Sequence, residues 1–284
     1  MELLHNEDLS RYSNFKIGGI ANNFYIPENT EELLMIINNS NIHDLLFLSN
    51  GSNILINDKK TFENVCLLKK FNTSITRYGN GQYKIGASVS LQKLVKTINE
   101  DGYGSIENLF SVPGLVGSSV AMNAGTGPNR KIYIGDFVKE VSAIKDGIIQ
   151  KFTQEQCGFS HRNSLFKTNM YIITEVLFEF PQKSDLEIKN EIRLKKEIIK
   201  QYQDYNFSSL GSIFSINNYK IMKISKMLSA LFFWHGIQFS KVANNWLINK
   251  GSGRYKQALL RIRIVMFLHL VFRKKCKLEI TIWK

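Results

Sequence analysis

The sequence has little cysteine and little proline, with three and four of these residues among 284. Four prolines without a low-complexity run exclude a linker, a stalk or a collagen-like chain. Cys66, Cys157 and Cys276 are widely spaced and form no C-x-x-C pair, so neither a disulfide framework nor a structural zinc site is expected. The histidines show no H-E-x-x-H spacing, and no metal site is predicted.

The sequence also lacks a hydrophobic run long enough to cross a membrane. The most apolar stretch, residues 259–272, contains 14 residues and is interrupted by Arg261 and Arg263, which makes it too short and too charged for a spanning helix. It fits a buried helix or strand, with a segment at a membrane surface as the alternative. The N-terminus carries early acids and no apolar core, unlike a secretory signal. We expect a cytoplasmic protein without stable membrane insertion.

Apolar and basic side chains are plentiful. Hydrophobic residues make up 44% and aromatic residues 12% of the sequence, which is enough for more than one folded core and excludes disorder as the main state. The net charge of +13 suits anionic partners such as nucleic acid, acidic membranes or phosphorylated small molecules, or reflects a lysine-rich composition alone. Outside residues 254–277 the basic residues are dispersed, so nucleic-acid binding is not expected.

Hydrophobic periodicity and turn residues predict three successive blocks. The first is a β-α-β unit that runs into the loop 49–53. The second begins near Asn72 and contains a hairpin at Lys145-Asp-Gly147. The third follows Pro181 and opens with an amphipathic helix. Predicted strands are 23–27, 44–48, 54–56, 83–86, 136–145, 148–152, 171–180 and 246–249, and predicted helices are 30–37, 91–99, 186–201 and 220–230, with Thr30 and Ser90 as caps.

Two loops rich in glycine, serine and asparagine stand out in the first 130 residues. Asn50-Gly-Ser-Asn53 follows a predicted buried strand, and its backbone N–H groups suit a phosphate, although a plain tight turn explains the same residues. In residues 113–125, Gly114 and Gly117 allow a close approach of the backbone, and a helix N-terminus suits an anion. A glycine-rich packing joint is the alternative. The spacing is not G-x-G-x-x-G, which disfavours a Rossmann dinucleotide site.

Two further segments carry candidate reactive side chains. Arg162, within residues 157–167, lies beside polar and aromatic residues and suits bidentate binding of a carboxylate, with a surface arginine as the alternative. Ser212, within Gly211-Ser-Ile-Phe214, lies in an apolar setting next to a glycine. A plain turn residue is the alternative interpretation of Ser212.

Six segments together resemble the UDP-N-acetylenolpyruvoylglucosamine reductase (MurB) family in order and approximate spacing. Each motif alone is unspecific, whereas the ordered set is specific. The resemblance is close over residues 9–218 and looser towards the C-terminus, and the length is similar to the shorter form of the family. The segments are Phe15-Lys-Ile-Gly-Gly19, Gly51-Ser-Asn53, Val112-Pro-Gly-Leu-Val-Gly117, Met122-Asn-Ala-Gly125, His161-Arg-x-Ser-x-Phe166 and Gly211-Ser-x-Phe214.

The resemblance implies an α+β fold, namely an FAD-binding fold of the vanillyl-alcohol-oxidase/PCMH type in two subdomains followed by a C-terminal α/β substrate-binding domain. The expected boundaries are residues 1–71 and 72–182 for the two FAD-binding subdomains and 183–284 for the C-terminal domain. It also implies a monomer that binds a UDP-sugar.

The implied activity is the NADPH-dependent reduction, through FAD, of the enolpyruvyl group of UDP-N-acetylenolpyruvoylglucosamine to UDP-N-acetylmuramate for peptidoglycan. The family's catalytic roles carry over to Arg162, which would stabilise the negative charge that develops on the substrate, and to Ser212, which would protonate the substrate carbon. Glu279, in the expected last strand 278–282, would act with Arg162; a solvent-facing strand residue is the alternative. Cofactor contacts carry over to Asn50, Gly51, Ser52, Asn53, Pro113, Gly114, Gly117, Asn123, Ala124 and Gly125.

Several positions depart from the family pattern. His161 stands where the family usually has tyrosine, and Ser49 replaces a usual glycine. Ser215-Ile-Asn217 replaces Lys-Asn-Pro, so a lysine expected near anionic phosphates is missing. These changes favour one alternative, a catalytically impaired relative that still binds flavin or UDP-sugar. The basic stretch 254–277 alone motivates another, a protein that binds RNA or a membrane surface.

Overall fold

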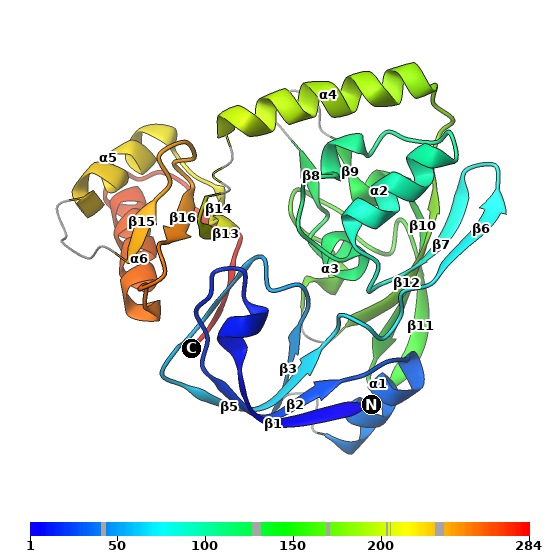
Figure 1. Cartoon of the computed structure of the whole chain (residues 1–284), viewed down its shortest axis with the longest axis horizontal. Coiled ribbons are helices and arrows are strands. Elements are labelled where there is room, and N and C mark those ends of the chain that lie inside the picture. Colours follow the sequence, from blue (N-terminus) through cyan, green and yellow to red (C-terminus); the bar gives the residue numbers. More distant parts are fainter. Residues whose placement is uncertain (41–43, 127–131, 169–170, 203, 205, 231–235) are drawn as a thin grey trace. The chain divides into compact units, whose positions relative to one another are not determined.

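The computed structural model describes residues 1–40, 44–126, 132–168, 171–202, 204, 206–230 and 236–284 (Figure 1). By their spatial contacts the residues form two compact units, each assembled from several stretches of the chain. The expected linear division at residues 71 and 182 stays a prediction. Unit 1 comprises Met1–Leu4, Phe24–Asn50 and Asn64–Glu197, and unit 2 comprises His5–Asn23, Gly51–Glu63 and Ile198–Lys284.

The first sheet has four strands in the order β1-β2-β5-β3. Strands β3 and β5 are parallel, with Leu45 opposite Asn64. Helix α1 starts after Asn29, whose side-chain oxygen accepts the N–H of Glu32 at 2.8 Å. The predicted cap at Thr30 is therefore one residue too late in the sequence, because Asn29 Oδ1 is the acceptor for the backbone N–H of Glu32 in the first turn. The bounds are β1 Glu2–Asp8, β2 Ile20–Ile26, β3 Leu45–Leu48, β5 Thr61–Leu67 and α1 Thr30–Asn39.

The second sheet, in unit 1, is antiparallel and has the order β11-β10-β12-β7-β6. Asp146 and Gly147, both with positive φ, form the predicted hairpin turn between β10 and β11. Helix α3 lies against strands β7 and β12 of this sheet and α2 packs on α3 (Figure 1), and Ser90 caps α2 as predicted. The bounds are β6 Ile75–Gly79, β7 Gln82–Gly86, β10 Val138–Lys145, β11 Ile148–Thr153, β12 Ile172–Glu179, α2 Leu91–Glu100 and α3 Val116–Ala121.

The remaining part of unit 1 consists of short elements around this sheet. The predicted strand 136–145 begins two residues late, because the Asp136 carboxylate accepts the N–H of Tyr133 at 2.8 Å and closes a 3-10 turn. Aromatic side chains fill the core, with Phe178 and Phe180 stacked at 5.4 Å. The bounds are β8 Gly125–Thr126, β9 Ile132–Tyr133 and the 3-10 helices η3 Glu107–Leu109, η4 Ile134–Phe137 and η5 Leu165–Lys167.

Unit 2 combines short sheets with two helices that pack on each other, α5 and α6 (Figure 1). The sheets are β13-β16-β15, β14-β17 and β18-β4, of which only the last is parallel. Their core includes Phe15, Leu55, Ile213, Leu247 and Ile262. The bounds are η1 Leu9–Tyr12, β4 Ile54–Ile56, β13 Ser208–Ser212, β14 Phe214–Ile216, β15 Ile237–Phe239, β16 Trp246–Asn249, β17 Lys277–Leu278, β18 Thr281–Trp283, α4 Asp185–Tyr202, which begins in unit 1, α5 Tyr219–Ala230 and α6 Tyr255–Val271.

The apolar stretch 259–272 lies mostly in α6 and is a helix with one buried and one exposed face. The expectation of a buried segment holds for one face only, because Phe267 and Leu270 are exposed. Within the described ranges, no helix has both the length and the apolar character needed to cross a membrane.

Candidate active site

Arg162 lies in a tight turn of unit 1. The backbone N–H groups of Ser160 and Asn163 each donate to the other's carbonyl oxygen, at 3.0 and 3.1 Å, and close the turn. Arg162 has a φ of +54°, a conformation that residues other than glycine seldom adopt. The Lys167 ammonium donates to the Arg162 carbonyl at 3.2 Å. Backbone strain of this kind persists only where surrounding contacts enforce it, and it gathers at functional sites.

Asn123 connects the glycine-rich segment 113–125 to this turn. Its Nδ2 donates to the Ser160 carbonyl at 2.9 Å, and its Oδ1 accepts the N–H of Gly135 at 3.1 Å. The side chain is buried and already used within the protein. The side chain of Asn123 thus holds the turn that carries Arg162, and the predicted contact of Asn123 with the cofactor stays a prediction.

His161, the residue before Arg162, is exposed and pairs with Tyr133. The Tyr133 hydroxyl lies 3.0 Å from His161 Nδ1, and the two rings meet edge to face. No local sequence pattern indicates this pairing, because the two residues are 28 positions apart. Cys157, in the same segment, is buried, and burial raises the pKa of its thiol to about 12. That thiol is protonated at neutral pH and is no nucleophile.

Part of segment 113–125 serves packing. The first two N–H groups of α3, those of Val116 and Gly117, donate to the carbonyls of Val89 and Ala87. The expected open helix N-terminus for an anion is thus already filled by protein carbonyls. A Cβ at Gly117 would lie 2.8 Å from Ala87 Cβ, and one at Gly125 would lie 2.3 Å from the Tyr133 ring. Close packing alone accounts for glycine at these two positions.

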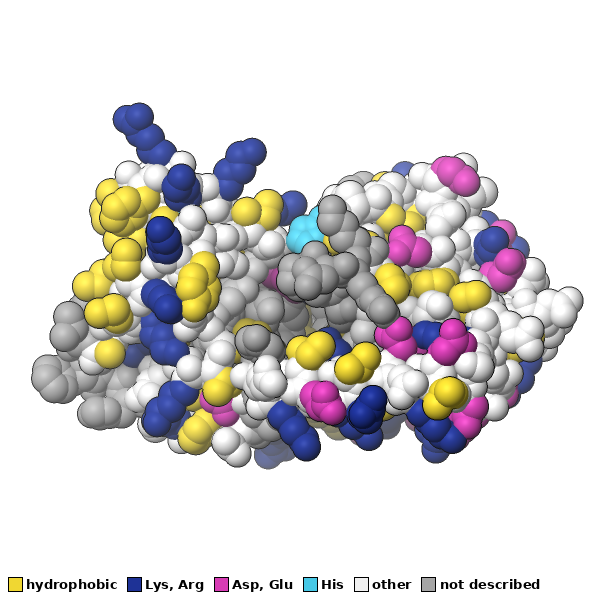
Figure 2. All heavy atoms as spheres, turned by 90° about the horizontal axis from the view of Figure 1, so that it is seen from above, with side chains coloured by type: hydrophobic (Ala, Val, Ile, Leu, Met, Phe, Trp, Pro, Cys, Tyr) yellow, Lys and Arg dark blue, Asp and Glu magenta, His cyan; other side chains and the backbone are white. Residues whose placement is uncertain are grey.

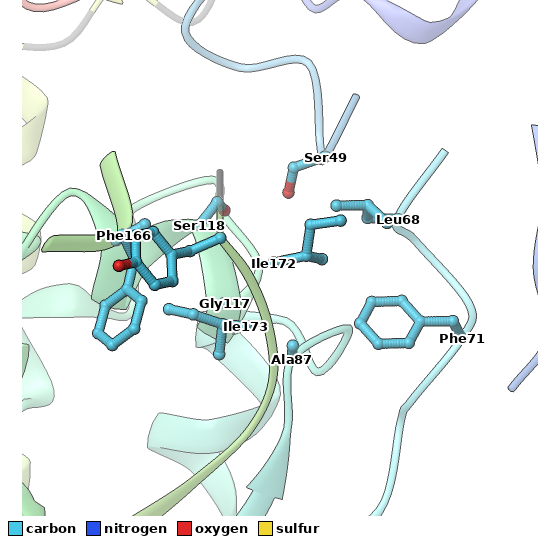
Figure 3. Close-up of a pocket in the computed structure, with 11 residues that line it drawn as sticks. Ser49, Leu68, Phe71, Ala87, Gly117, Ser118, Phe166, Ile172 and Ile173 are labelled. Atoms are coloured by element: carbon cyan, nitrogen blue, oxygen red, sulfur yellow. The ribbon is translucent and has the colours of Figure 1, made fainter. Parts of the chain in front are cut away.

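A pocket lies beside α3 in unit 1 (Figure 3). It is mostly apolar, and Figure 3 shows Phe71 and Phe166 on opposite sides of it. Its volume of about 90 Å³ is smaller than the roughly 300–1,000 Å³ of typical small-molecule pockets. The pocket can accept part of a planar ligand and not a complete dinucleotide. It is lined by Ser49, Leu68, Phe71, Ala87, Gly117, Ser118, Ala121, Phe166, Tyr171, Ile172 and Ile173.

Ser212 ends β13 in unit 2. The preceding Gly211 has a φ of +67°. Trp246 lies opposite Ser212 on β16, and its indole Nε1 donates to Ser212 Oγ at 3.3 Å. An indole N–H can only donate. The hydroxyl oxygen of Ser212 is therefore the acceptor in this pair, and its own proton is left to be donated elsewhere.

Glu279 lies next to the same strand end. Its backbone N–H donates to the Ile213 carbonyl at 2.8 Å, so Glu279 adjoins the residue that follows Ser212. The predicted last strand 278–282 is in fact two strands, and Glu279 falls in the break between β17 and β18. The break arises because the chain changes partners, from β14 to β4.

The loop Gly51–Asn53 belongs to this cluster. Asn53 Nδ2 donates to the Glu279 carbonyl at 3.4 Å, and the Thr281 N–H donates to the Asn53 carbonyl at 3.0 Å. A Cβ at Gly211 would lie 3.8 Å from the Ser52 carbonyl oxygen. Unit 2 thus brings together one predicted cofactor loop and two predicted catalytic residues, whereas Arg162 and segment 113–125 lie in unit 1.

Asn53 Oδ1 is buried and, among the described residues, has no hydrogen-bond partner. Leaving such an acceptor unpaired costs about 1–3 kcal/mol. An unpaired buried acceptor next to a loop with a positive φ at Gly51 fits a ligand that supplies a hydroxyl or amide donor. A flavin nucleotide carries such donors, so this loop fits part of FAD.

Two asparagines that the sequence analysis missed support the cluster in unit 2. Asn245 donates from Nδ2 to the Phe214 carbonyl at 2.8 Å and accepts the Phe214 N–H at 3.1 Å. Asn249 donates to the Phe15 carbonyl and accepts the N–H groups of Gly251 and Gly253. The sequence pattern does not predict these contacts, because the partners of Asn245 and Asn249 are backbone groups, and several of them are distant in sequence.

Comparison with known proteins identifies relatives over the whole chain. Residues 21–152 match the family described as FAD binding domain. The UDP-N-acetylenolpyruvoylglucosamine reductase of Fervidobacterium nodosum is 30% identical, with 100% of this chain and 92% of that protein aligned. The corresponding reductase of Carboxydothermus hydrogenoformans is 29% identical over 99% of this chain and 93% of that protein.

The crystal structure of UDP-N-acetylenolpyruvylglucosamine reductase (MurB) from Thermus caldophilus superposes with a TM-score of 0.77 at 24% identity, covering 100% of this chain and 98% of that one. This likeness and the match of residues 21–152 confirm the expected α+β FAD-binding fold. With 30% identity to the Fervidobacterium reductase along its entire length, the chain belongs to the UDP-N-acetylenolpyruvoylglucosamine reductase family.

Proposed function

We propose that the chain is an FAD-dependent reductase that converts UDP-N-acetylenolpyruvoylglucosamine to UDP-N-acetylmuramate with NADPH as the reductant. Membership of the family over the whole chain supports the reaction, and the match of residues 21–152 supports the cofactor. The structural observation that carries the proposal is the cluster in unit 2, where Glu279 bonds to the residue after Ser212 and Asn53 bonds to Glu279.

FAD, when bound, supplies the hydride that reduces the enolpyruvyl double bond, and NADPH is the reductant of FAD. The backbone of Gly51–Asn53 would hold its pyrophosphate, since consecutive N–H groups in a tight loop suit an anion. The buried Oδ1 of Asn53 would accept a hydrogen bond from the cofactor. Apolar side chains of the pocket in unit 1 would pack against one of its ring systems.

Arg162 would stabilise the negative charge that develops on the substrate. When the terminal enolpyruvyl carbon gains a hydride, charge builds on the adjoining carbon and its carboxylate. A guanidinium binds a carboxylate with two parallel hydrogen bonds. The strained turn holds the backbone of Arg162 in place before the reaction, so little reorganisation is needed when the charge forms.

Ser212 would donate the proton that completes the reduction. A serine hydroxyl is a weak acid, but a carbon that carries enolate charge is basic enough to accept its proton within hydrogen-bond range. The Trp246 N–H donates to Ser212 Oγ and so supports negative charge on that oxygen as the proton leaves. Glu279 would act with Arg162 on the same intermediate and share or relay a proton.

The product is a precursor of peptidoglycan, so the reaction belongs to the synthesis of the cell wall, which maintains the shape of the cell. We place the enzyme in the cytoplasm and expect a monomer. All three small molecules that it would bind are polyanions, which suits a protein of net charge +13.

The test measures the two half-reactions separately without oxygen. Purified protein should be yellow, NADPH should bleach the colour, and UDP-N-acetylenolpyruvoylglucosamine should restore it. A yellow protein that shows neither step would contradict the proposed reaction and indicate a binding protein. A colourless protein whose denaturation releases no FAD would overturn the cofactor as well.

Ser212→Ala tests the assigned proton donor. NADPH should bleach this variant as fast as the wild type, whereas substrate should restore the colour at least a hundredfold more slowly, the order expected for a lost general acid. Ser209→Ala, in the same strand β13, is the matched control and should leave both steps unchanged. Equal slowing of both steps by Ser212→Ala would show that the serine supports the fold and not the chemistry.

A further inference from the structure

The net positive charge of the chain arises in its C-terminal part. Residues 219–284 contain fourteen lysines and arginines and a single acid, Glu279, which amounts to the whole net charge of +13. Residues 1–218 contain 23 basic and 23 acidic residues and are neutral overall. A lysine-rich composition would spread charge along the whole chain, so this segregation points to an anionic partner for the C-terminal part.

Helix α6 presents a continuous apolar and basic face. Lys256, Leu260, Arg263, Phe267 and Leu270 follow one another at intervals of three or four residues and so share one side of the helix. Phe267 is 62% and Leu270 75% exposed. Lys274 continues the same line beyond the helix end. Large apolar side chains in such a row are costly in water unless a partner covers them.

This face points away from the proposed chemistry in unit 2. On the opposite side of α6, His269 is buried, accepts the Asn218 N–H at 2.9 Å and stacks on Phe214, two residues beyond Ser212. The side of α6 that faces the Ser212 strand is thus filled with protein. The exposed row therefore does not serve the substrate site that the proposed function places at Ser212.

Helix α5, which packs on α6, adds to the surface. Ile224 and Met227 are exposed on it, and Lys220 and Lys223 flank them. Figure 2 shows yellow and dark blue side chains close together at the left end of the molecule, with no magenta among those at its outer edge. We call these residues of α5 and the exposed row of α6 the basic apolar face.

We propose that the basic apolar face docks onto an anionic lipid surface. Phospholipid headgroups neutralise the lysines and arginines while the acyl chains below them take up Phe267 and Leu270, which one flat helix can do without crossing the bilayer. A second copy of the chain is disfavoured, since two such faces repel each other. Nucleic acid would satisfy the charge but would leave the aliphatic side chains in water.

Vesicle co-sedimentation of the purified holoprotein tests the proposal. It should bind vesicles of mixed phosphatidylcholine and phosphatidylglycerol and should not bind pure phosphatidylcholine. Raising the salt concentration should release it, because exposed charges are screened beyond about 10 Å at 0.1 M. The double variant Arg263→Gln with Lys274→Gln should weaken binding about 25-fold, at about fivefold for each basic charge removed.

An apolar pair of variants separates lipid from nucleic acid. Phe267→Gln with Leu270→Gln should weaken vesicle binding at least tenfold, because the burial of two large apolar side chains is lost. The matched control is Leu186→Gln with Leu194→Gln on α4, also exposed but in the neutral part of the chain, and it should bind like the wild type. Neither pair touches the proposed catalytic residues, so the half-reactions should be unchanged.

Three results would overturn the proposal. One is vesicle binding that stays unchanged in the Phe267→Gln, Leu270→Gln double variant, which would show that the binding is non-specific attraction between charges. Another is salt-sensitive binding of a single-stranded RNA oligonucleotide with no binding to anionic vesicles, which would assign the face to nucleic acid. The third is a dimer in sedimentation that the same pair abolishes, which would assign the face to a second copy. None of these results affects the reductase assignment, which the half-reactions test by themselves.

Discussion

Unit 1 places Arg162 by holding that residue itself at a strained, positive φ, whereas unit 2 places Ser212 by giving the positive φ to its neighbour, Gly211. Arg162 has a φ of +54° and Gly211 a φ of +67°. Glycine adopts this conformation without a steric penalty, while an L residue with a Cβ pays for it. At Arg162, one residue must supply both the charged side chain and the strained backbone of the turn, and these two demands conflict. In unit 2 they are divided, because Gly211 supplies the backbone conformation and Ser212 supplies the side chain.

The difference shows where each unit must supply rigidity. The turn at Arg162 needs outside support, and it receives it from Asn123 on the Ser160 carbonyl and from Lys167 on the Arg162 carbonyl. The strand end at Ser212 needs no such support for its backbone, and its contacts serve the side chain and the next residues instead. We expect substitutions in unit 1 to reveal a conflict between stability and activity, and those in unit 2 to affect the two properties separately.

Arg162→Gly should produce the largest effect and the clearest conflict. Loss of the guanidinium should slow restoration of the flavin colour by substrate about 100- to 1,000-fold, the loss typical for one group that stabilises developing charge. Relief of the positive φ should offset the lost side-chain contacts, so thermal unfolding should shift little or upward. Arg162→Ala, which keeps the strain, is the control and should unfold at a lower temperature than Arg162→Gly. Equal unfolding temperatures would show that the turn stores no strain.

Asn123→Ala should cost the most stability. It leaves the N–H of the buried Gly135 without its partner, at about 1–3 kcal/mol, and removes one of the two hydrogen bonds that the Ser160 carbonyl accepts. Urea unfolding should therefore show a loss of roughly 1–3 kcal/mol, and restoration of the colour should slow because the Arg162 turn loosens. Normal turnover in a destabilised protein would mean that the turn keeps its shape without Asn123.

The sequence predicted much of this arrangement in outline. Turn chemistry located the β10–β11 hairpin, because Asp146-Gly147 tolerates positive φ, and periodicity located α2 and its Ser90 cap. Ordered motifs located the family, which the full-length relatives confirm. Gly117 and Gly125 are predicted cofactor contacts, and the structure shows that close packing also favours glycine at both positions; the cofactor contacts themselves stay a prediction. Spacing cannot separate these causes, since both demand a missing Cβ.

Contacts across long sequence separations escaped prediction. The break at Glu279 depends on which strands β17 and β18 pair with, and the Asn245 side chain bonds to backbone groups 31 residues away. The sequence favours a buried segment at residues 259–272, because the stretch is apolar and only two arginines interrupt it. The structure instead shows a helix, α6, with one exposed face. Arg261 is in fact buried and Arg263 exposed, so the two interruptions lie on opposite faces. Such features follow from the tertiary fold and leave no local pattern.

Gly211→Ala tests the division of labour in unit 2. Among the described residues, a Cβ there would meet only the Ser52 carbonyl oxygen, at 3.8 Å, so the cost is the positive φ alone, about 1–2 kcal/mol. Stability to urea should fall by this amount. Bleaching by NADPH should be unaffected. A much larger loss of stability would show that residue 211 also packs tightly.

Trp246→Phe should have the smallest effect and isolates the orientation of Ser212. It removes one N–H donor at 3.3 Å from Ser212 Oγ and keeps most of the ring, a loss of about 0.5–1.5 kcal/mol. Restoration of the colour by substrate should slow about threefold to tenfold, while NADPH bleaching and thermal unfolding stay close to those of the wild type. The same substitution in a Ser212→Ala background should add nothing, because the acceptor is gone. Additive losses in the double variant would mean that Trp246 contributes through packing, and the hydroxyl of Ser212 would then take its orientation from the substrate and not from unit 2.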